Sequence, residues 1–247
     1  MEIHPHTHTE RKKWHHYFWE FFMLFLAVTL GFFVENQRES FVEGKREKQY
    51  IKSMIADLKE DTIRYAVTIG LVEKKVSGLD SMLDALNKQP LNATFLYYYM
   101  RKYVSGYNWV ETSQRTISQL KNAGGMRLIH YQDASDSIND YDLSLNWIRI
   151  QEATIANYFD IARQMSWEIF DQYSISSLNT SIETAEKILR SGLSLQLITN
   201  DNKTMKKFSN AISHWRGINK FYIGLLSDRK ARAQRLISFL QKKYSLR

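Results

Sequence analysis

The segment IKSMIADLKEDTIRYAVTIGLVEKKVSGLDSMLDAL, residues 51–86, decides the fold. Its apolar residues recur at alternating intervals of three and four, the spacing that places them on one face of an α-helix. The series consists of Ile51, Met54, Leu58, Tyr65, Ile69, Val72, Val76, Leu79, Leu83 and Leu86. One position of the series is missing, around Asp61 and Thr62. The pattern predicts a long, coiled-coil-like helix.

The composition favours an all-α fold. Of the 247 residues, 44% are apolar and 24% charged, which is typical of a folded chain. The two prolines are Pro5 and Pro90, so long stretches carry no obligatory helix breaker. The absence of cysteine excludes thiol catalysis, zinc sites with cysteine ligands and disulfides.

Before this helix, residues 17–34 read YFWEFFMLFLAVTLGFFV, with Glu20 as the one charged residue. At 1.5 Å per residue the run spans about 27 Å, close to the thickness of a bilayer core. Trp14 and Trp19 lie where headgroups would be. A buried core helix and a cleavable signal peptide are the alternatives, but the run is continuously apolar and no small-residue cleavage site follows it. We predict a transmembrane anchor over residues 14–36, with membrane lipid as a partner.

The anchor divides the chain into a polar, His-rich tail (1–13), the span (14–36) and a helical domain (37–247). The fold prediction is therefore a transmembrane helix that continues into the long helix and packs with further helices as an elongated bundle. Basic residues flank the span on both sides, so their count is nearly balanced. A short tail that stays inside favours a cytoplasmic N-terminus, an inner-membrane location and a periplasmic domain.

Two features inside the span bear on association. Ala27 and Gly31 form a small-xxx-small pair, which would let another membrane helix approach closely. We therefore expect other integral membrane subunits, or a second copy of the chain, as partners. Glu20 is either a functional intramembrane carboxylate or a side chain that reaches the interface near His16; its position at the end of the run favours the interface.

The excess positive charge lies at the other end of the chain. The formal net charge is +8, and residues 201–247 alone carry +10. We expect the last helix to run antiparallel to the long first helix, so that its basic surface meets anionic headgroups or an acidic partner; a solvated helix face is the alternative. No nucleic-acid-binding motif accompanies the charge, so we expect no nucleic-acid partner. The residues of this basic surface are Arg229, Lys230, Arg232, Arg235, Lys242 and Lys243.

Cap signals predict the remaining helices. They comprise a short helix over 95–104 capped by Asn92, another over 109–123 closed by Gly124 and Gly125, a long one capped by Asp133, one from the capping box 180–183 to about 198, and a last one capped by Asp201 and Asn202.

No catalytic constellation emerges. Ser113, His130 and Asp133 offer the residue types of a triad, but no nucleophile elbow surrounds a serine, and His214 stands on a polar turn. The acidic residues after position 132 suit a helix N-terminus without any ligand. Gly124 and Gly125 lack the context of a phosphate loop. We expect no enzyme activity and no cofactor.

A metal site is not predicted either. The tail and the start of the span carry His4, His6, His8, His15 and His16. Alternating imidazoles can bind a transition metal, but no nearby residue completes a tetrahedral set.

Two segments resemble a known family. FWEFFMLFLAVTLGFFVENQRE, residues 18–39, resembles the N-terminal anchor of many small Bacteroidota proteins. TISQLKNAGGMRLI, residues 116–129, is similar to the core motif of a family of unknown function that is anchored in the same way. The resemblance implies a single-span, helical, inner-membrane protein and carries over no catalytic residue.

These observations predict an accessory or scaffolding subunit of an inner-membrane complex. The alternative is an extracytoplasmic helical bundle that senses a ligand. A transducer commonly needs an output module across the membrane, where only about sixteen residues are expected here. A pocket with convergent polar groups inside the bundle would favour the sensor.

Overall fold

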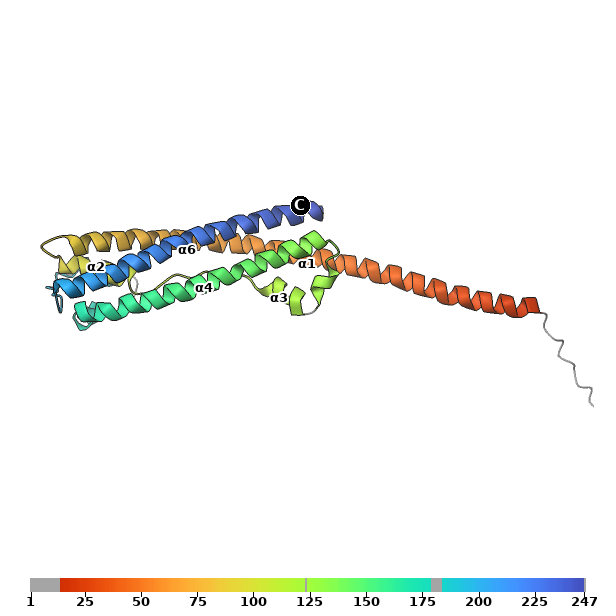
Figure 1. The fold of residues 1–247 in the computed structure, drawn as a ribbon, viewed down its shortest axis with the longest axis horizontal. Coiled ribbons are helices and arrows are strands. Elements are labelled where there is room, and N and C mark those ends of the chain that lie inside the picture. The colour runs from red at the N-terminus through yellow and green to blue at the C-terminus, as the bar shows by residue number, and fades with distance from the viewer. Residues whose placement is uncertain (1–13, 123, 179–183, 247) are drawn as a thin grey trace, which may run out of the picture. The chain divides into compact units, whose positions relative to one another are not determined.

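The computed structural model describes residues 14–122, 124–178 and 184–246 (Figure 1). Over these ranges the chain is built from helices, and its strand-like pairing is limited to one bridge between Phe170 and Leu197. The all-α prediction is confirmed. The elements are α1 (Trp14–Asn87), α2 (Ala93–Tyr103), α3 (Arg115–Asn122), η1 (Gly125–Leu128), α4 (Gln132–Ile169), η2 (Tyr173–Leu178), α5 (Thr184–Arg190) and α6 (Asn202–Lys243).

The chain forms two units that divide after Gln49. The first contains residues 14–49 of α1, and the second is a helical bundle that begins at Tyr50 rather than at residue 37 as predicted. The predicted continuation of the apolar helix into the long helix is confirmed, because α1 runs without interruption from Trp14 to Asn87.

Three long helices build the bundle: residues 50–87 of α1, α4 and α6. The C-terminal half of α6 packs with the part of α1 that begins at Ile51, and its N-terminal half packs with the part that ends at Leu86. The two helices are therefore antiparallel, as predicted. α4 runs beside α6, also in the opposite direction.

The core of the bundle has two ends, which we name by the neighbouring residue of α1. At the Asn87 end, α2 and α5 close the core together with the segments around Phe170. The hydroxyl of Tyr97 accepts from the amide of Asp171 at 2.7 Å and donates to the carbonyl of Gln196 at 2.9 Å. One buried side chain thus fixes two connections.

Two positions require glycine, one because of packing and one because of its backbone conformation. A Cβ on Gly78 of α1 would lie 2.4 Å from the ring of Tyr103, so the ring rests directly on the helix backbone. Gly124 has φ +66°, the left-handed conformation that ends α3, as predicted for one of the two adjacent glycines.

The caps at Asn92 and Asp201 are confirmed: Asn92 accepts from the amide of Phe95 and Asp201 from that of Thr204. Asp133 is not a cap, because α4 already starts at Gln132 and Asp133 lies in its first turn. The helix predicted from residue 109 begins only at Arg115.

The helix predicted to reach about residue 198 ends at Arg190, where Gly192 turns the chain with φ +66°. The capping box assigned to its start, residues 180–183, lies outside the described residues.

Candidate functional site

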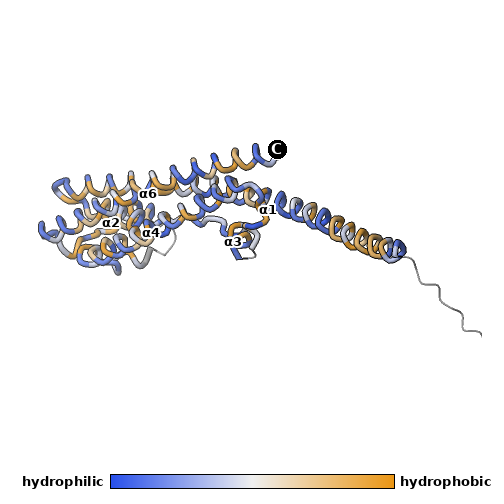
Figure 2. Tube along the Cα trace, turned by 45° about the vertical axis from the view of Figure 1, so that its right-hand side comes forward, coloured by the Kyte–Doolittle hydropathy of each residue, from blue (hydrophilic) through white to orange (hydrophobic). Residues whose placement is uncertain are grey.

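Apart from the half-buried Leu26, the large apolar side chains of residues 14–34 are exposed, and Figure 2 shows this stretch as the most continuously hydrophobic part of α1. Its most apolar 18 residues have a mean hydropathy of 1.9, and none of them is buried within the chain. By length and composition this helix can cross a membrane, and it is the one such helix among the described residues.

Ala27 and Gly31 are exposed, and a Cβ on Gly31 would meet no atom within 4 Å. The predicted packing face is therefore open within this chain. Glu20 lies 3.1 Å from the Nε2 atom of His16, one turn earlier. Trp14 and Trp19 are exposed at the same end of the segment.

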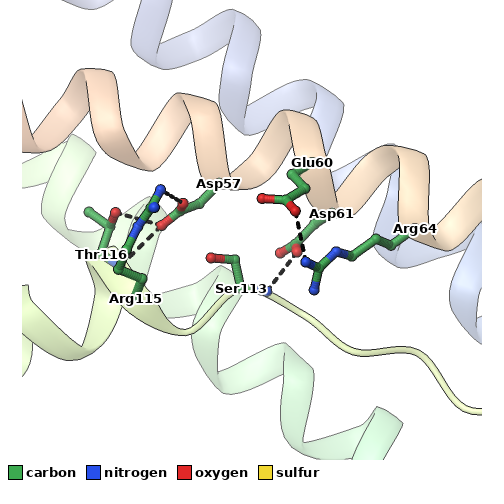
Figure 3. Close-up of polar contacts among 7 residues, drawn as sticks. All are labelled: Asp57, Glu60, Asp61, Arg64, Ser113, Arg115 and Thr116. Atoms are coloured by element: carbon green, nitrogen blue, oxygen red, sulfur yellow. Dashed lines mark hydrogen bonds and ion pairs between the residues drawn. The ribbon is translucent and has the colours of Figure 1, made fainter.

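The most polar part of the bundle interior surrounds residues 104–114, the non-helical link from α2 to α3, which we call the α2–α3 connection. Asp57 of α1 is 3% exposed and reaches the start of α3 (Figure 3). It accepts from the amide and the hydroxyl of Thr116, at 3.1 and 2.5 Å, and from Arg115 at 2.5 Å. A side chain of α1 thus performs the capping task that a residue before α3 would ordinarily perform.

Asp61 lies one turn further along α1 and is 1% exposed. It accepts from the amide of Ser113 at 2.7 Å (Figure 3) and from the hydroxyl of Tyr141 at 3.4 Å. The Tyr141 hydroxyl lies 3.2 Å from that of Tyr65. The gap in the apolar series of α1 is therefore explained by Asp61, a buried carboxylate that binds the backbone of the α2–α3 connection.

Lys75 holds the opposite end of the connection. Its ammonium group donates to the carbonyls of Tyr103 and Gly106, at 3.2 and 2.5 Å, and lies 5.3 Å from the ring centre of Trp215. The buried cation therefore completes the hydrogen bonding of carbonyls that no helix serves.

The middle of the connection is bound from two sides. Glu152 of α4 accepts from the amide of Val110 at 2.9 Å and from the hydroxyl of Tyr222 at 2.5 Å. Arg64 of α1 donates to the carbonyl of Glu111 at 2.7 Å. These contacts explain why residues 109–114 are not helical: side chains of α1 and α4 satisfy their backbone groups in an extended path.

Burial shifts the ionisation of these groups in different directions. It raises the pKa of Asp61 from 3.8 to about 6, and the hydrogen bond from Ser113 only partly offsets this. Burial also raises the pKa of Asp57, but hydrogen bonds from Thr116 and Arg115 outweigh it, and the net pKa is lowered. Desolvation lowers the pKa of Lys75 to about 8.

The contacts described for the candidate triad residues are with other groups, and the amide of Ser113 donates to Asp61. The Nδ1 atom of His130 lies 3.0 Å from the carbonyl oxygen of Leu128, and Asp133 accepts from Lys243 at 2.8 Å. The ring of His214 lies 4.4 Å from that of Tyr158, tilted by 46°. The roles of Lys75 and Glu152 are not predicted from the sequence, because neither residue interrupts an apolar pattern. Asp61 alone is marked in the sequence, by the gap in the apolar series of α1.

Among the described residues, no cluster of three or more potential metal ligands occurs. The histidines at positions 4, 6 and 8 lie outside these residues.

The basic surface predicted on α6 is smaller than expected. Arg229 is buried, 7% exposed, because its position falls on the face of α6 that meets the core. Arg232 pairs with Asp228 at 2.8 Å, and Lys243 pairs with Asp133. Arg232 and Arg235 line a groove, while Lys230 is half-buried and Lys242 is exposed. Contact of this surface with lipid or a partner stays a prediction.

The two grooves between α4 and α6 are open to solvent, and a further hollow of about 450 Å³ at the Asn87 end is lined by Asn87, Asn200 and Lys206, among others. A groove of about 270 Å³ between α4 and α6 is lined by Asp140, Arg235 and Phe239, among others. A second groove of about 560 Å³ lies between the same helices and includes Thr154, Gly217 and Phe221.

Comparison of the chain with models of known families, with curated proteins and with solved structures finds no match.

Proposed function

We propose that this protein is a non-enzymatic accessory or scaffolding subunit of an inner-membrane complex. One span, residues 14–36, would anchor it, with the N-terminus in the cytoplasm and the bundle in the periplasm. A single observation carries the proposal. The most apolar 18 residues of α1 are not buried by any other part of the chain, whereas the buried charged groups of the bundle bind the chain's own backbone.

The span supports membrane association because exposed aromatic and aliphatic side chains over this length are costly in water and favourable in a bilayer. The open face at Ala27 and Gly31 supports close packing of a further helix. In lipid such packing depends on close backbone contact rather than on the hydrophobic effect, which is why small residues favour it.

The bundle interior favours a scaffold over a ligand sensor. A sensor needs a pocket in which polar groups converge on a ligand. Here the interior carboxylates of Asp57 and Asp61 and the ammonium group of Lys75 contact the α2–α3 connection and the start of α3. These interactions stiffen the bundle, which suits a spacer or docking domain. The family resemblance of residues 18–39 and 116–129 agrees with an anchored helical protein.

The proposal is tested by purifying the tagged full chain from its native membrane in a gentle detergent and identifying the proteins that accompany it. We expect other integral membrane proteins in a fixed ratio. In the variant Gly31→Ile, insertion should be unchanged, whereas recovery of these proteins should fall at least about tenfold, since bulk prevents close approach.

Gly44→Ile is the matched control, because Gly44 also has open space around it and lies outside the predicted span. Recovery of the chain without other membrane proteins, or equal recovery with both variants, would contradict the scaffold proposal.

The orientation has its own test. Protease added to spheroplasts should digest the bundle and leave the N-terminal tail protected. Digestion only from the cytoplasmic side would reverse the proposed topology.

A further inference from the structure

Large apolar side chains are exposed on the outer sides of α4 and α6, and we call this surface the α4/α6 face. Its large side chains are more than half exposed: Leu143 61%, Trp147 62%, Ile150 57% and Phe221 65%. On α4 they follow a spacing of four and three that continues through Thr154. This is the pattern of a helix that packs against another helix.

The same face of α6 carries two exposed glycines beside its large side chain. Gly217 and Gly224 flank Phe221, and a Cβ on either glycine would meet no atom within 4 Å. No contact among the described residues requires these glycines, although each costs about 1 kcal/mol in a helix interior relative to alanine. Their placement is explained if another helix approaches α6 closely at this point.

Charges divide between the two helices at one end of the face. Asp136 and Asp140 are exposed on α4, whereas Arg232 and Arg235 are exposed on α6. Asp140 and both arginines line one groove. The acid on α6, Asp228, is already paired with Arg232.

We propose that a second copy of this chain docks on the α4/α6 face about a two-fold axis parallel to the helices. Such a rotation places α4 of one chain against α6 of the other and keeps equal levels together. Acidic positions then meet basic ones, Trp147 meets Gly224, and Ile150 meets Phe221. The face is thus complementary to itself.

Contacts within one chain set the levels. Gln151 donates to the carbonyl of Ile218, and the ring of Phe159 lies 5.7 Å from that of Trp215. Counting along the antiparallel helices from these pairs places Trp147 level with Gly224 and Thr154 level with Gly217. In the same way, Arg235 lies level with Asp136, and Asp140 lies one turn further along α4.

The size of the surface fits a dimer. The exposed parts of the four large side chains amount to roughly 400–500 Å², taking about 150–250 Å² for a whole aromatic side chain. A standard interface buries about 800 Å² per partner around an apolar centre.

The other exposed apolar stripe is less suited to a second copy. It consists of Ile63, Val67 and Leu71 on α1 and is purely aliphatic. A two-fold axis parallel to α1 would place each residue of this stripe opposite the same residue of the second copy. Glu60 and Lys74, at the two ends of the stripe, would then each face a like charge. The inference therefore concerns the α4/α6 face, and it does not depend on the proposed scaffold role.

Cysteine cross-linking tests the pairing, because the chain has no cysteine of its own. Two differently tagged full-length chains, one with Thr154→Cys and one with Gly217→Cys, are co-expressed and oxidised in the membrane. We expect a disulfide-linked heterodimer at a yield at least about tenfold above that of a matched pair on α1, Ala66→Cys with Gly70→Cys. Equal yields would overturn the proposal.

A second test measures the dissociation constant of the dimer for the full chain in detergent. It compares variants that disrupt the apolar face with variants that exchange its charges. Ile150→Glu should weaken the dimer about 30-fold or more, whereas the equally exposed control Ile63→Glu should not. Asp140→Arg and Arg235→Asp should each weaken it, and the two changes together should restore it.

A monomeric wild-type chain, or a dimer that Ile150→Glu leaves intact, would overturn the proposal. So would a native-membrane cross-link from Thr154→Cys that captures only a different protein.

Discussion

At the Asn87 end of the bundle core the long helices are closed by packed aromatic rings, whereas at the Tyr50 end charged side chains bind a non-helical backbone. The ring of Phe170 lies 5.1 Å from that of Tyr97 and 5.8 Å from that of Phe208. At the other end Asp57 and Asp61 bind the residues that lead into α3. The core along α1 is thus closed by van der Waals contacts between rings at the Asn87 end and by hydrogen bonds to backbone groups at the Tyr50 end.

A helical bundle can hold a non-helical segment when buried side chains bind its backbone groups. Short helices satisfy their own backbone groups and need only an apolar face, so α2 and α5 can be held by packing. The α2–α3 connection cannot do this, and buried side chains must supply its missing partners. The Tyr50 end should therefore depend on pH and on single polar atoms, and the Asn87 end on volume.

The largest effect is expected at the Asn87 end. Phe208→Ala removes a fully buried ring and leaves a cavity, which should lower the free energy of unfolding by about 4 kcal/mol. Thermal unfolding of the full chain in detergent, followed by circular dichroism, measures this. Phe208→Leu keeps most of the volume and should cost about half as much or less. A loss below about 1 kcal/mol in Phe208→Ala would show that the rings do not close this end.

At the Tyr50 end, Asp57→Ala leaves the amide of Thr116 and the guanidinium of Arg115 without their partner. We expect a loss of about 3 kcal/mol in the free energy of unfolding. Asp57→Asn keeps one acceptor oxygen and should lose less. Denaturant titration compares the variants, and equal stability of Asp57→Ala and wild type would refute the role of this carboxylate as a cap.

The two carboxylates should respond to pH with opposite signs. Because the folded-state pKa of Asp61 is raised to about 6, its contribution to stability is fully present below about pH 4 and is lost as the pH rises through 6. The pKa of Asp57 is lowered, so its contribution is present above the unfolded-state value and is lost as the pH falls.

Unfolding measured from pH 4 to pH 7 separates the two. Relative to wild type, Asp61→Asn should gain on the order of 2–3 kcal/mol over this interval, since the amide does not titrate. Tyr65→Phe, which keeps both carboxylates, should leave most of the pH dependence in place. The same slope in wild type and Asp61→Asn would assign the titration to another group.

The smallest effect is expected from the exposed ion pair at the Asn87 end, where Lys102 lies 2.6 Å from Glu186. Lys102→Met should change the free energy of unfolding by less than about 1 kcal/mol, because water screens the pair. Salt titration of wild type and variant is the measurement. A loss as large as that of Asp57→Ala would mean that polar contacts stabilise both ends equally.

Much of the architecture could be predicted from local signals. Apolar spacing located α1, α4 and α6, and the caps at Asn92 and Asp201 gave two helix starts. The helix expected from residue 109 was wrong because its backbone groups are bound from α1 and α4, which no local pattern records. Aspartate is a common helix cap, which is why the sequence predicts a cap at Asp133. The helix already begins one residue earlier, at Gln132.

The helical class and the apolar segment of residues 17–34 could be derived from the sequence alone, whereas the antiparallel pairing of the first and last helices was one of two expectations until the packing confirmed it. Periodicity and hydropathy are properties of neighbouring residues, and they can therefore be read along the chain. Tertiary structure alone decided that Asp57, Asp61, Lys75 and Glu152 converge on one connection and that Arg229 is buried. The partners in these contacts are separated by tens of residues, and only the packing of the helices brings them together.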